Sequence, residues 1–309
     1  MKRHEFAATN ADLDYVVALL GDQGFQANYS GPTTIEQMRT GTALLVDDDK
    51  LKDVPAGVEV TPMELAGRPA ERLHGGAPDT GKVIVYLHGG GFIRGSLDMG
   101  RANAAELAHA ARVPVISVAY RQAPEHPFPA ATEDILAVYR ALLARGYLPG
   151  QIVVAGESAG GCLALTLLPH LVQEGLALPA GVAGISPMTD LRMSGASWDT
   201  NAGRDIATRE MGRRMVGLYI REQDLDHPLA APVNGAVPPA APILLCVGTH
   251  ETMLSDVERY AGQADAAGAD VTLNLYQAMP HGFTKFAIPL ARQAIADVAR
   301  WCAARLGRA

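Results

Sequence analysis

A single serine stands among glycines in the segment 156–160, which reads Gly-Glu-Ser-Ala-Gly and matches the pattern G-x-S-x-G. The short segment before it, 151–155, is mostly apolar with three β-branched residues in a row, as in a buried strand, and residues 159–168 are rich in Ala and Leu, as in a helix. In this setting the motif predicts a sharp strand-to-helix turn that presents the hydroxyl of Ser158 for nucleophilic attack. Small residues also open helices without any catalytic role, so the remaining motifs decide between the two interpretations.

A nucleophilic serine needs a base to take its proton and an acid to orient that base. In a sheet with helices between its strands, these partners are expected on loops after later strands, in the order serine, acid, histidine. His281 follows the last predicted strand, 271–276, and is the candidate base. His250 comes earlier, beside the acid candidates, and is interpreted as a loop residue.

The acid is expected just after the predicted strand 242–248, where two carboxylates are available. Glu251 is closer to the end of the strand, where the turn should lie. Asp256 opens the next predicted helix, where a carboxylate can serve as a cap or interact with the helix dipole. Glu251 is therefore the preferred acid, and Asp256 is the alternative.

The sequence His-Gly-Gly-Gly at 88–91 directly follows the predicted strand 83–87. Adjacent glycines let the backbone approach a ligand closely and turn its N–H groups inward. Such N–H groups can bind the oxyanion that forms when a carbonyl is attacked. A phosphate-binding loop is disfavoured because the segment has no G-x-x-x-x-G-K-[ST] motif and no lysine.

Strands and helices alternate along most of the chain, which predicts a mostly parallel sheet with helices on both faces. Eight strands are predicted, at 58–60, 68–73, 83–87, 113–119, 151–155, 181–185, 242–248 and 271–276. Helices are predicted at about 98–111, 131–145, 159–173, 255–267 and 289–305.

Two regions do not fit this alternation. The first fifty or so residues look helical and loosely attached, with a capping box at 33–36 that predicts a second helix to about Val46. The acidic run 47–49 is interpreted as a solvated turn. Residues 188–239 interrupt the pattern with a helix-like stretch at 209–219, and long insertions of this kind often form lids or binding loops.

The composition of the 309 residues sets limits on function. Hydrophobic residues make up 48% and the net charge is -7, which predicts a large core and argues against nucleic acid or an anionic membrane surface as a partner. The first residues show no signal-peptide pattern, and no stretch is long enough for a spanning helix. Three cysteines favour a reducing, cytoplasmic location without disulfides.

Taken together, these motifs resemble the bacterial hormone-sensitive-lipase family (family IV) of α/β-hydrolase carboxylesterases. The resemblance runs from about residue 55 to the end of the chain. The matching pieces, in family order, are HGGGF (88–92), AYRQAPEHPFPAA (119–131), GESAGG (156–161), ISPMTDL (185–191), VGTHETMLSD (247–256) and MPHGF (279–283).

The resemblance implies an α/β-hydrolase fold for residues 1–309 as a single domain, with a helical cap formed by about 1–50 and about 188–226. It also implies Ser158 as nucleophile and His281 as base. The oxyanion donors would be the N–H groups of Gly90, Gly91 and Ala159, with Gly89 as a further candidate.

Two positions depart from the family's usual pattern. Glu157 replaces the aspartate of G-D-S-A-G, and the acid loop lacks D-P-L-x-D, so that Glu251 stands where the first aspartate would be. Some members resemble this chain in having a glutamate there. The loop 121–129, which contains three prolines, is interpreted as structural support for the HGGG loop.

The expected function is that of a serine carboxylesterase that hydrolyses short- to medium-chain acyl esters through an acyl-enzyme, without a metal or organic cofactor. The alternatives are a lactone hydrolase with the same triad and a non-catalytic small-molecule-binding protein on the same fold. Family resemblance also suggests a homodimer through the last strand and helix. The predicted walls of the substrate pocket are Phe92, Met38, Trp198 and Tyr219.

Overall fold

The computed structural model describes residues 1–21, 34–40, 54–76 and 81–308. Within these residues one sheet has nine strands in the order β1-β9-β8-β7-β6-β4-β5-β3-β2. β2 pairs antiparallel with β3, and β3 pairs antiparallel with β5, whereas the other neighbours are parallel. The strands are β1 (Lys2–Phe6), β2 (Glu59–Leu65), β3 (Arg68–His74), β4 (Val83–Leu87), β5 (Val115–Val118), β6 (Ile152–Glu157), β7 (Gly181–Ile185), β8 (Pro242–Gly248) and β9 (Asp270–Tyr276). The predicted α/β-hydrolase architecture is confirmed.

The expected count of eight strands was one too low, because Lys2–Phe6 forms the additional strand β1 beside β9. Its sequence, KRHEF, has no apolar alternation, and its first four residues are exposed. Charged side chains are typical of an edge strand, which pairs through its backbone on one side only. These residues were expected to be helical and part of a cap, and they belong to the sheet instead.

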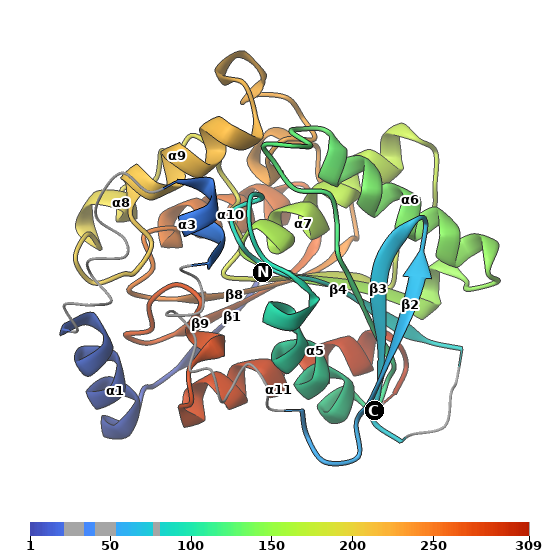
Figure 1. Ribbon diagram of the computed structural model, residues 1–309, viewed down its shortest axis with the longest axis horizontal. Helices are drawn as coiled ribbons and strands as arrows, with labels where there is room; N and C mark the ends of the chain where they lie inside the picture. The colour runs from blue at the N-terminus through green and yellow to red at the C-terminus, as the bar shows by residue number, and fades with distance from the viewer. Residues whose placement is uncertain (22–33, 41–53, 77–80, 309) are drawn as a thin grey trace.

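Helices cover both faces of the sheet (Figure 1). α5 (Leu97–Ala111) and α11 (Pro289–Arg305) lie on one face, and α6 (Ala130–Ala144), α7 (Ala159–Gln173) and α10 (Leu254–Ala266) lie on the other. The central strands β4, β6 and β7 are buried along their whole length, as expected for parallel strands that are covered on both faces. The loops that follow the carboxyl ends of these strands therefore begin at fixed positions.

The remaining elements surround this core. α1 (Asn10–Gly21) and α3 (Ile35–Thr40) precede β2, and α8 (Ser197–Thr200), α9 (Arg209–Tyr219) and two short 3-10 helices lie between β7 and β8. We call residues 186–241, between β7 and β8, the insertion. In Figure 1, α8 and α9 lie on the same side of the sheet as α7 and α10.

The predicted capping box lies one residue later than expected. The hydroxyl of Thr34 accepts a hydrogen bond from Gln37 N, and the Gln37 side chain accepts one from Thr34 N. The helix is described as far as Thr40. The rest of its predicted length and the acidic run 47–49 lie outside the described residues.

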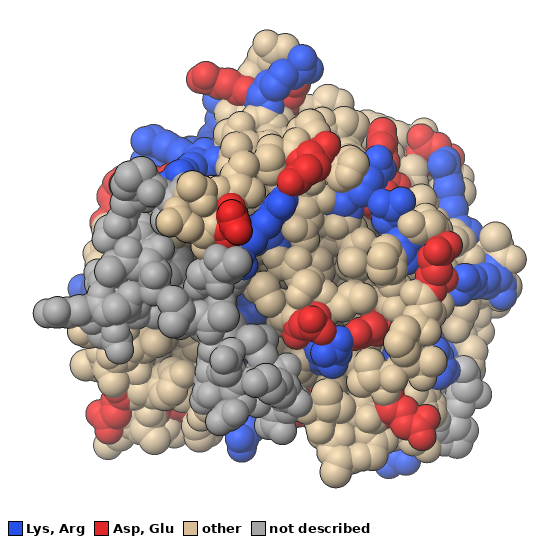
Figure 2. Space-filling view, viewed as in Figure 1, with Lys and Arg blue, Asp and Glu red and all other residues tan. Residues whose placement is uncertain are grey.

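The visible surface mixes charges of both signs (Figure 2). Basic and acidic side chains pair at several places in the described chain, as in Arg192 with Asp226 at 2.6 Å and Arg39 with Glu125 at 2.6 Å. Such exposed pairs stabilise a fold only weakly. Within the described ranges, no helix combines the length and the apolar character needed to cross a membrane.

Candidate active site

Ser158 lies in the turn between β6 and α7, as the G-x-S-x-G motif predicts. Its φ of 55° and ψ of -116° are unusual for a residue with a side chain, and its N–H donates to Ile185 O at 2.9 Å. The flanking glycines allow this turn because the backbone packs closely around it. A Cβ atom on Gly156 would lie 2.2 Å from Gly160 O, and one on Gly160 would lie 2.1 Å from Leu87 O.

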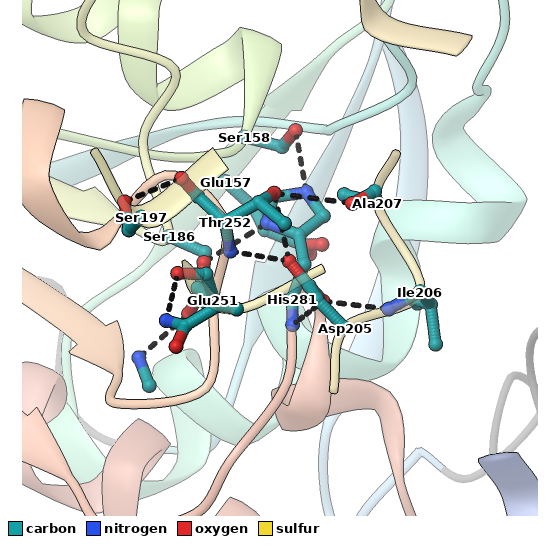
Figure 3. Close-up of polar contacts among 12 residues, drawn as sticks. Glu157, Ser158, Ser186, Ser197, Asp205, Ile206, Ala207, Glu251, Thr252 and His281 are labelled. Atoms are coloured by element: carbon teal, nitrogen blue, oxygen red, sulfur yellow. Dashed lines mark hydrogen bonds and ion pairs between the residues drawn. The ribbon is translucent and has the colours of Figure 1, made fainter. Parts of the chain in front are cut away.

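Three side chains from three strand ends form a continuous row of hydrogen bonds (Figure 3). Ser158 Oγ lies 3.0 Å from His281 Nε2, and His281 Nδ1 lies 3.0 Å from Glu251 Oε2. Ser158 follows β6, Glu251 follows β8 and His281 follows β9. This arrangement can move a proton from the serine hydroxyl to the imidazole while the carboxylate holds the ring.

The carboxylate of Glu251 is fully buried and held on both oxygens. Its Oε1 accepts hydrogen bonds from Ser186 Oγ at 2.7 Å and from Gly248 N at 2.6 Å. Burial raises the pKa of Glu251, whereas the hydrogen bond and charge of His281 lower it. The sequence did not single out Ser186, which stands at the end of β7, because an isolated serine carries no signal of this contact.

The electrostatics of His281 favour the protonated ring. Burial alone would lower the pKa of His281, but the hydrogen bond and charge of Glu251, with the charges of Asp205 and Glu157, raise it above its usual value. An imidazolium that forms during a reaction would therefore be stabilised where it arises.

Asp256, the alternative acid, has other partners. Its Oδ2 accepts a hydrogen bond from Trp198 Nε1 at 2.7 Å, and Arg259 lies 3.2 Å from its Oδ1. Burial raises the pKa of Asp256 to about 6. It is Glu251 that the structure places against His281.

The glycine loop supplies N–H groups beside Ser158. Gly90 and Gly91 line the same pocket as Ser158 and His281, with φ values of 128° and 61°. Among the described residues, neither N–H has a hydrogen-bond partner, and Ala159 N belongs to the unpaired first turn of α7. These three groups can donate to an oxyanion. Gly89 packs against Glu157 and Ser158 and does not line the pocket.

The loop after β5 braces the glycine loop, as predicted for residues 121–129. Tyr120 Oη donates to His88 O at 2.8 Å, Gln122 Nε2 donates to Gly95 O at 2.8 Å, and Ala123 N donates to Phe92 O at 3.0 Å. Burial lowers the pKa of His88 to about 4, so the His88 ring is neutral at physiological pH.

A pocket of about 850 Å³, including its open mouth, lies beside Ser158 and His281. Of the four predicted wall residues, Trp198 lines it. Phe92 and Tyr219 do not, because their rings stack on each other at 3.9 Å in the core, and Met38 packs in the same core. Five methionines line the pocket instead, namely Met99, Met188, Met211, Met215 and Met253.

Two charged groups near the triad were not predicted from the sequence. Lys285, on the loop after β9, forms an ion pair with Glu157, which is 1% exposed, and Asn103 Nδ2 also donates to Glu157 at 3.3 Å. Asp205, from the insertion, accepts a hydrogen bond from His281 N. Neither residue belongs to a motif, so their roles become visible only from the folded chain.

Known proteins are similar to this chain in both sequence and fold. A family model described as the alpha/beta hydrolase fold matches residues 84–285. An acetyl-hydrolase from Streptomyces hygroscopicus is 40% identical over 207 residues, covering 66% of this chain and 69% of the relative. An esterase from Acinetobacter venetianus is 34% identical over 248 residues, covering 79% and 82%.

A solved structure shares nearly the whole fold. The crystal structure of an esterase from the bacterial hormone-sensitive lipase family covers 97% of this chain and 100% of its own, with a TM-score of 0.88 and 33% identity. The chain thus belongs to the α/β-hydrolases, and within them to the hormone-sensitive-lipase family of esterases. It is a carboxylic ester hydrolase.

Proposed function

We propose that the protein is a serine carboxylesterase that hydrolyses short- to medium-chain acyl esters through an acyl-enzyme. The observation that supports this most directly is the unbroken row of hydrogen bonds from Ser158 Oγ to His281 to Glu251, with both links at 3.0 Å, whose first two members line an open pocket. Among the described residues the N–H groups of Gly90, Gly91 and Ala159 have no other hydrogen-bond partner, and they are the proposed oxyanion donors.

In the proposed reaction, Ser158 Oγ attacks the ester carbonyl and its proton passes to His281 Nε2. Glu251 stabilises the imidazolium, and the N–H groups of Gly90, Gly91 and Ala159 bind the negative oxygen of the tetrahedral intermediate. The C–O bond to the alcohol then breaks, and His281 protonates the leaving oxygen. Water attacks the acyl-enzyme with the same base and releases the acid and free Ser158.

The lining of the pocket supports apolar acyl groups as substrates. Besides the five methionines, it includes Trp198, Ile206, Ala207 and Phe286. Methionine side chains are flexible and polarisable, and they adapt to ligands of different shape. We propose that the insertion, with α1 and α3, forms a cap over this pocket in a single-domain enzyme, and that the pocket under it limits acyl length.

We further propose a cytoplasmic location, because Cys162, Cys246 and Cys302 are buried and unpaired. A homodimer was expected through the last strand and helix. Because β9 is paired on both sides, by β8 and by β1, a homodimer would use α11 or another surface instead of strand pairing on β9, and light scattering at several protein concentrations would detect it.

Hydrolysis of p-nitrophenyl esters from acetate to palmitate tests the proposal. We expect turnover that is greatest for short acyl chains and that is lost in Ser158→Ala. Equal activity in that variant would contradict the role of the serine. Competition by a lactone that is itself opened faster than any chain ester would favour the lactone-hydrolase alternative, and stable binding without turnover would favour the binding-protein alternative.

A further inference from the structure

Asp205 connects the insertion to both catalytic loops (Figure 3). It lies between α8 and α9, and it is 7% exposed. Its Oδ1 accepts a hydrogen bond from His281 N at 2.6 Å, and its Oδ2 accepts one from Thr252 N at 2.7 Å. One carboxylate therefore holds the backbone of the catalytic histidine and the backbone of the residue next to Glu251.

The carboxylate has further partners that fix its orientation. Ile206 N donates to Oδ1 at 2.7 Å. The hydroxyl of Thr252 lies 3.0 Å from Oδ2 and 3.1 Å from Ala207 O, so its single proton goes to one of these two acceptors. A buried carboxylate with three backbone donors is strongly held, because each bond is charge-assisted.

The segment around Asp205 is itself anchored to the acid loop. Asn201 Nδ2 donates to Glu251 O at 2.8 Å and to Thr249 O at 3.1 Å, and Ser197 Oγ donates to Thr252 O at 2.6 Å. These contacts reach the acid loop alone. Asp205 extends the connection to His281.

We propose that Asp205 is a positioning residue, which holds the loops of His281 and Glu251 in the relative placement that the serine reaction needs. The inference rests on the proposed function, because it assigns Asp205 to the same reaction. Asp205 does not touch the nucleophile, so its effect passes through the position and charge of His281.

The charge of Asp205 predicts the direction in which its removal should shift the pKa of His281. It raises the pKa of His281 and also that of Glu251. The other charged or titratable groups around these residues are Arg204, His250, Glu251, Glu157 and Lys285. Among these groups and Asp205, the carboxylates are the ones that raise the pKa of His281. Removal of the Asp205 charge should therefore lower the pKa of His281.

The test uses Asp205→Asn and Asp205→Ala in the full chain, with Asp199→Asn as the matched control. Asp199 lies in the same insertion, but its carboxylate is 78% exposed and pairs with Arg209. We measure kcat and KM against pH on p-nitrophenyl butyrate. We also measure the rate at which diisopropyl fluorophosphate labels Ser158, a reaction that needs an activated serine but no ester turnover.

For Asp205→Asn we expect kcat to fall roughly tenfold to a hundredfold, because small misplacements of catalytic groups have effects of this size. KM should change little, and the midpoint of the acidic limb should move to lower pH in both assays. Asp199→Asn should match the wild type. If Asp205→Ala does not fold, Asp205→Asn, which keeps the size of the side chain, decides the question.

A wild-type kcat and an unshifted pH profile in folded Asp205→Asn would overturn the inference. A fall in kcat without any shift in either assay would also overturn it, because a merely structural role predicts that pattern. If no ester is hydrolysed but Ser158 is labelled with the expected shift, the proposed function fails and the role of Asp205 stands. If the reagent does not label wild-type Ser158, both fail.

Discussion

The strand ends that carry the proposed catalytic groups and the insertion that borders the pocket are built differently. Ser158, Glu251 and His281 each follow a parallel strand that is paired with a neighbouring strand on both sides. α9 of the insertion buries Met215, Val216 and Tyr219 and leaves much of its remaining surface exposed. The sheet thus holds Ser158, Glu251 and His281 in place, whereas the insertion lines the pocket beside them, and Asp205 of the insertion is hydrogen-bonded to the loops of Glu251 and His281.

The largest expected effect comes from removing the nucleophile at a strand end. Ser158→Ala should lower kcat by about six orders of magnitude, because no other group replaces the hydroxyl. Ser194→Ala, which changes an exposed serine of the insertion, should keep wild-type turnover. Steady-state kinetics on a p-nitrophenyl ester measures kcat for both variants. Comparable losses of kcat in the two variants would contradict the difference between the strand ends and the insertion.

The acid loop offers the next largest difference. Glu251→Ala should lower kcat by about three to four orders of magnitude, because His281 loses the partner that orients it. Asp256→Asn should change kcat only slightly, since its contacts are to Trp198 and Arg259. The opposite ranking would make Asp256 the acid.

Substitution of one glycine in each region should change the stability of the protein in opposite directions. Gly160→Ala would place a Cβ 2.1 Å from Leu87 O, so the turn must shift and the midpoint of thermal unfolding should fall by many degrees. Gly217→Ala, on α9, meets no atom within 4 Å and should stabilise the protein by up to about 1 kcal/mol. Differential scanning calorimetry measures the unfolding midpoints of the two variants, and equal midpoints would refute the expected difference in stability between the two positions.

Substitutions in the pocket wall should have smaller effects on activity than those at the strand ends. Met211→Ala removes apolar contact from the insertion side of the pocket, so the preference should move towards longer acyl chains by roughly tenfold. Met63→Ala serves as the control, because Met63 is a partly buried methionine of the edge strand β2, at the other end of the strand order from β8 and β9. An unchanged chain-length profile in Met211→Ala would argue against a pocket shaped by the insertion.

The smallest effect is a shift in pH dependence. Because the pKa of His281 is raised, its ring stays protonated to higher pH and cannot accept the serine proton. kcat/KM should therefore rise with pH through a midpoint above about 6.5, the ordinary value for histidine. Glu251→Gln should lower that midpoint, and a flat profile would exclude His281 as the base.

The sequence predicted that Ser158, Glu251 and His281 lie at three strand ends, because each is tied to a local motif, and the structure brings the three side chains together. Ser158 is flanked by the glycines of its motif, and His281 comes shortly after a predicted strand, so both positions can be recognised from adjacent residues in the sequence. The order of the motifs then indicated which strand ends meet. The preference for Glu251 over Asp256 followed from distance to the strand end alone.

What the sequence could not predict depends on contacts between distant segments. β1 has five residues with no apolar period, so nothing in KRHEF indicates a strand. Asp205 contacts backbone N–H groups, which every residue except proline carries, so no residue type marks its partners. Phe92 and Tyr219 are large and apolar, and residue type alone does not distinguish a core position from a pocket wall.

The central claim is that Ser158 carries the acyl group during turnover. Rapid acid quenching of the enzyme with p-nitrophenyl butyrate, followed by peptide mass spectrometry, tests it most directly. We expect a butyryl group on the peptide that contains Ser158, at a level that falls once the substrate is consumed. Steady ester hydrolysis without any acylated peptide, or with the acyl group on another residue such as Cys162, would contradict the account.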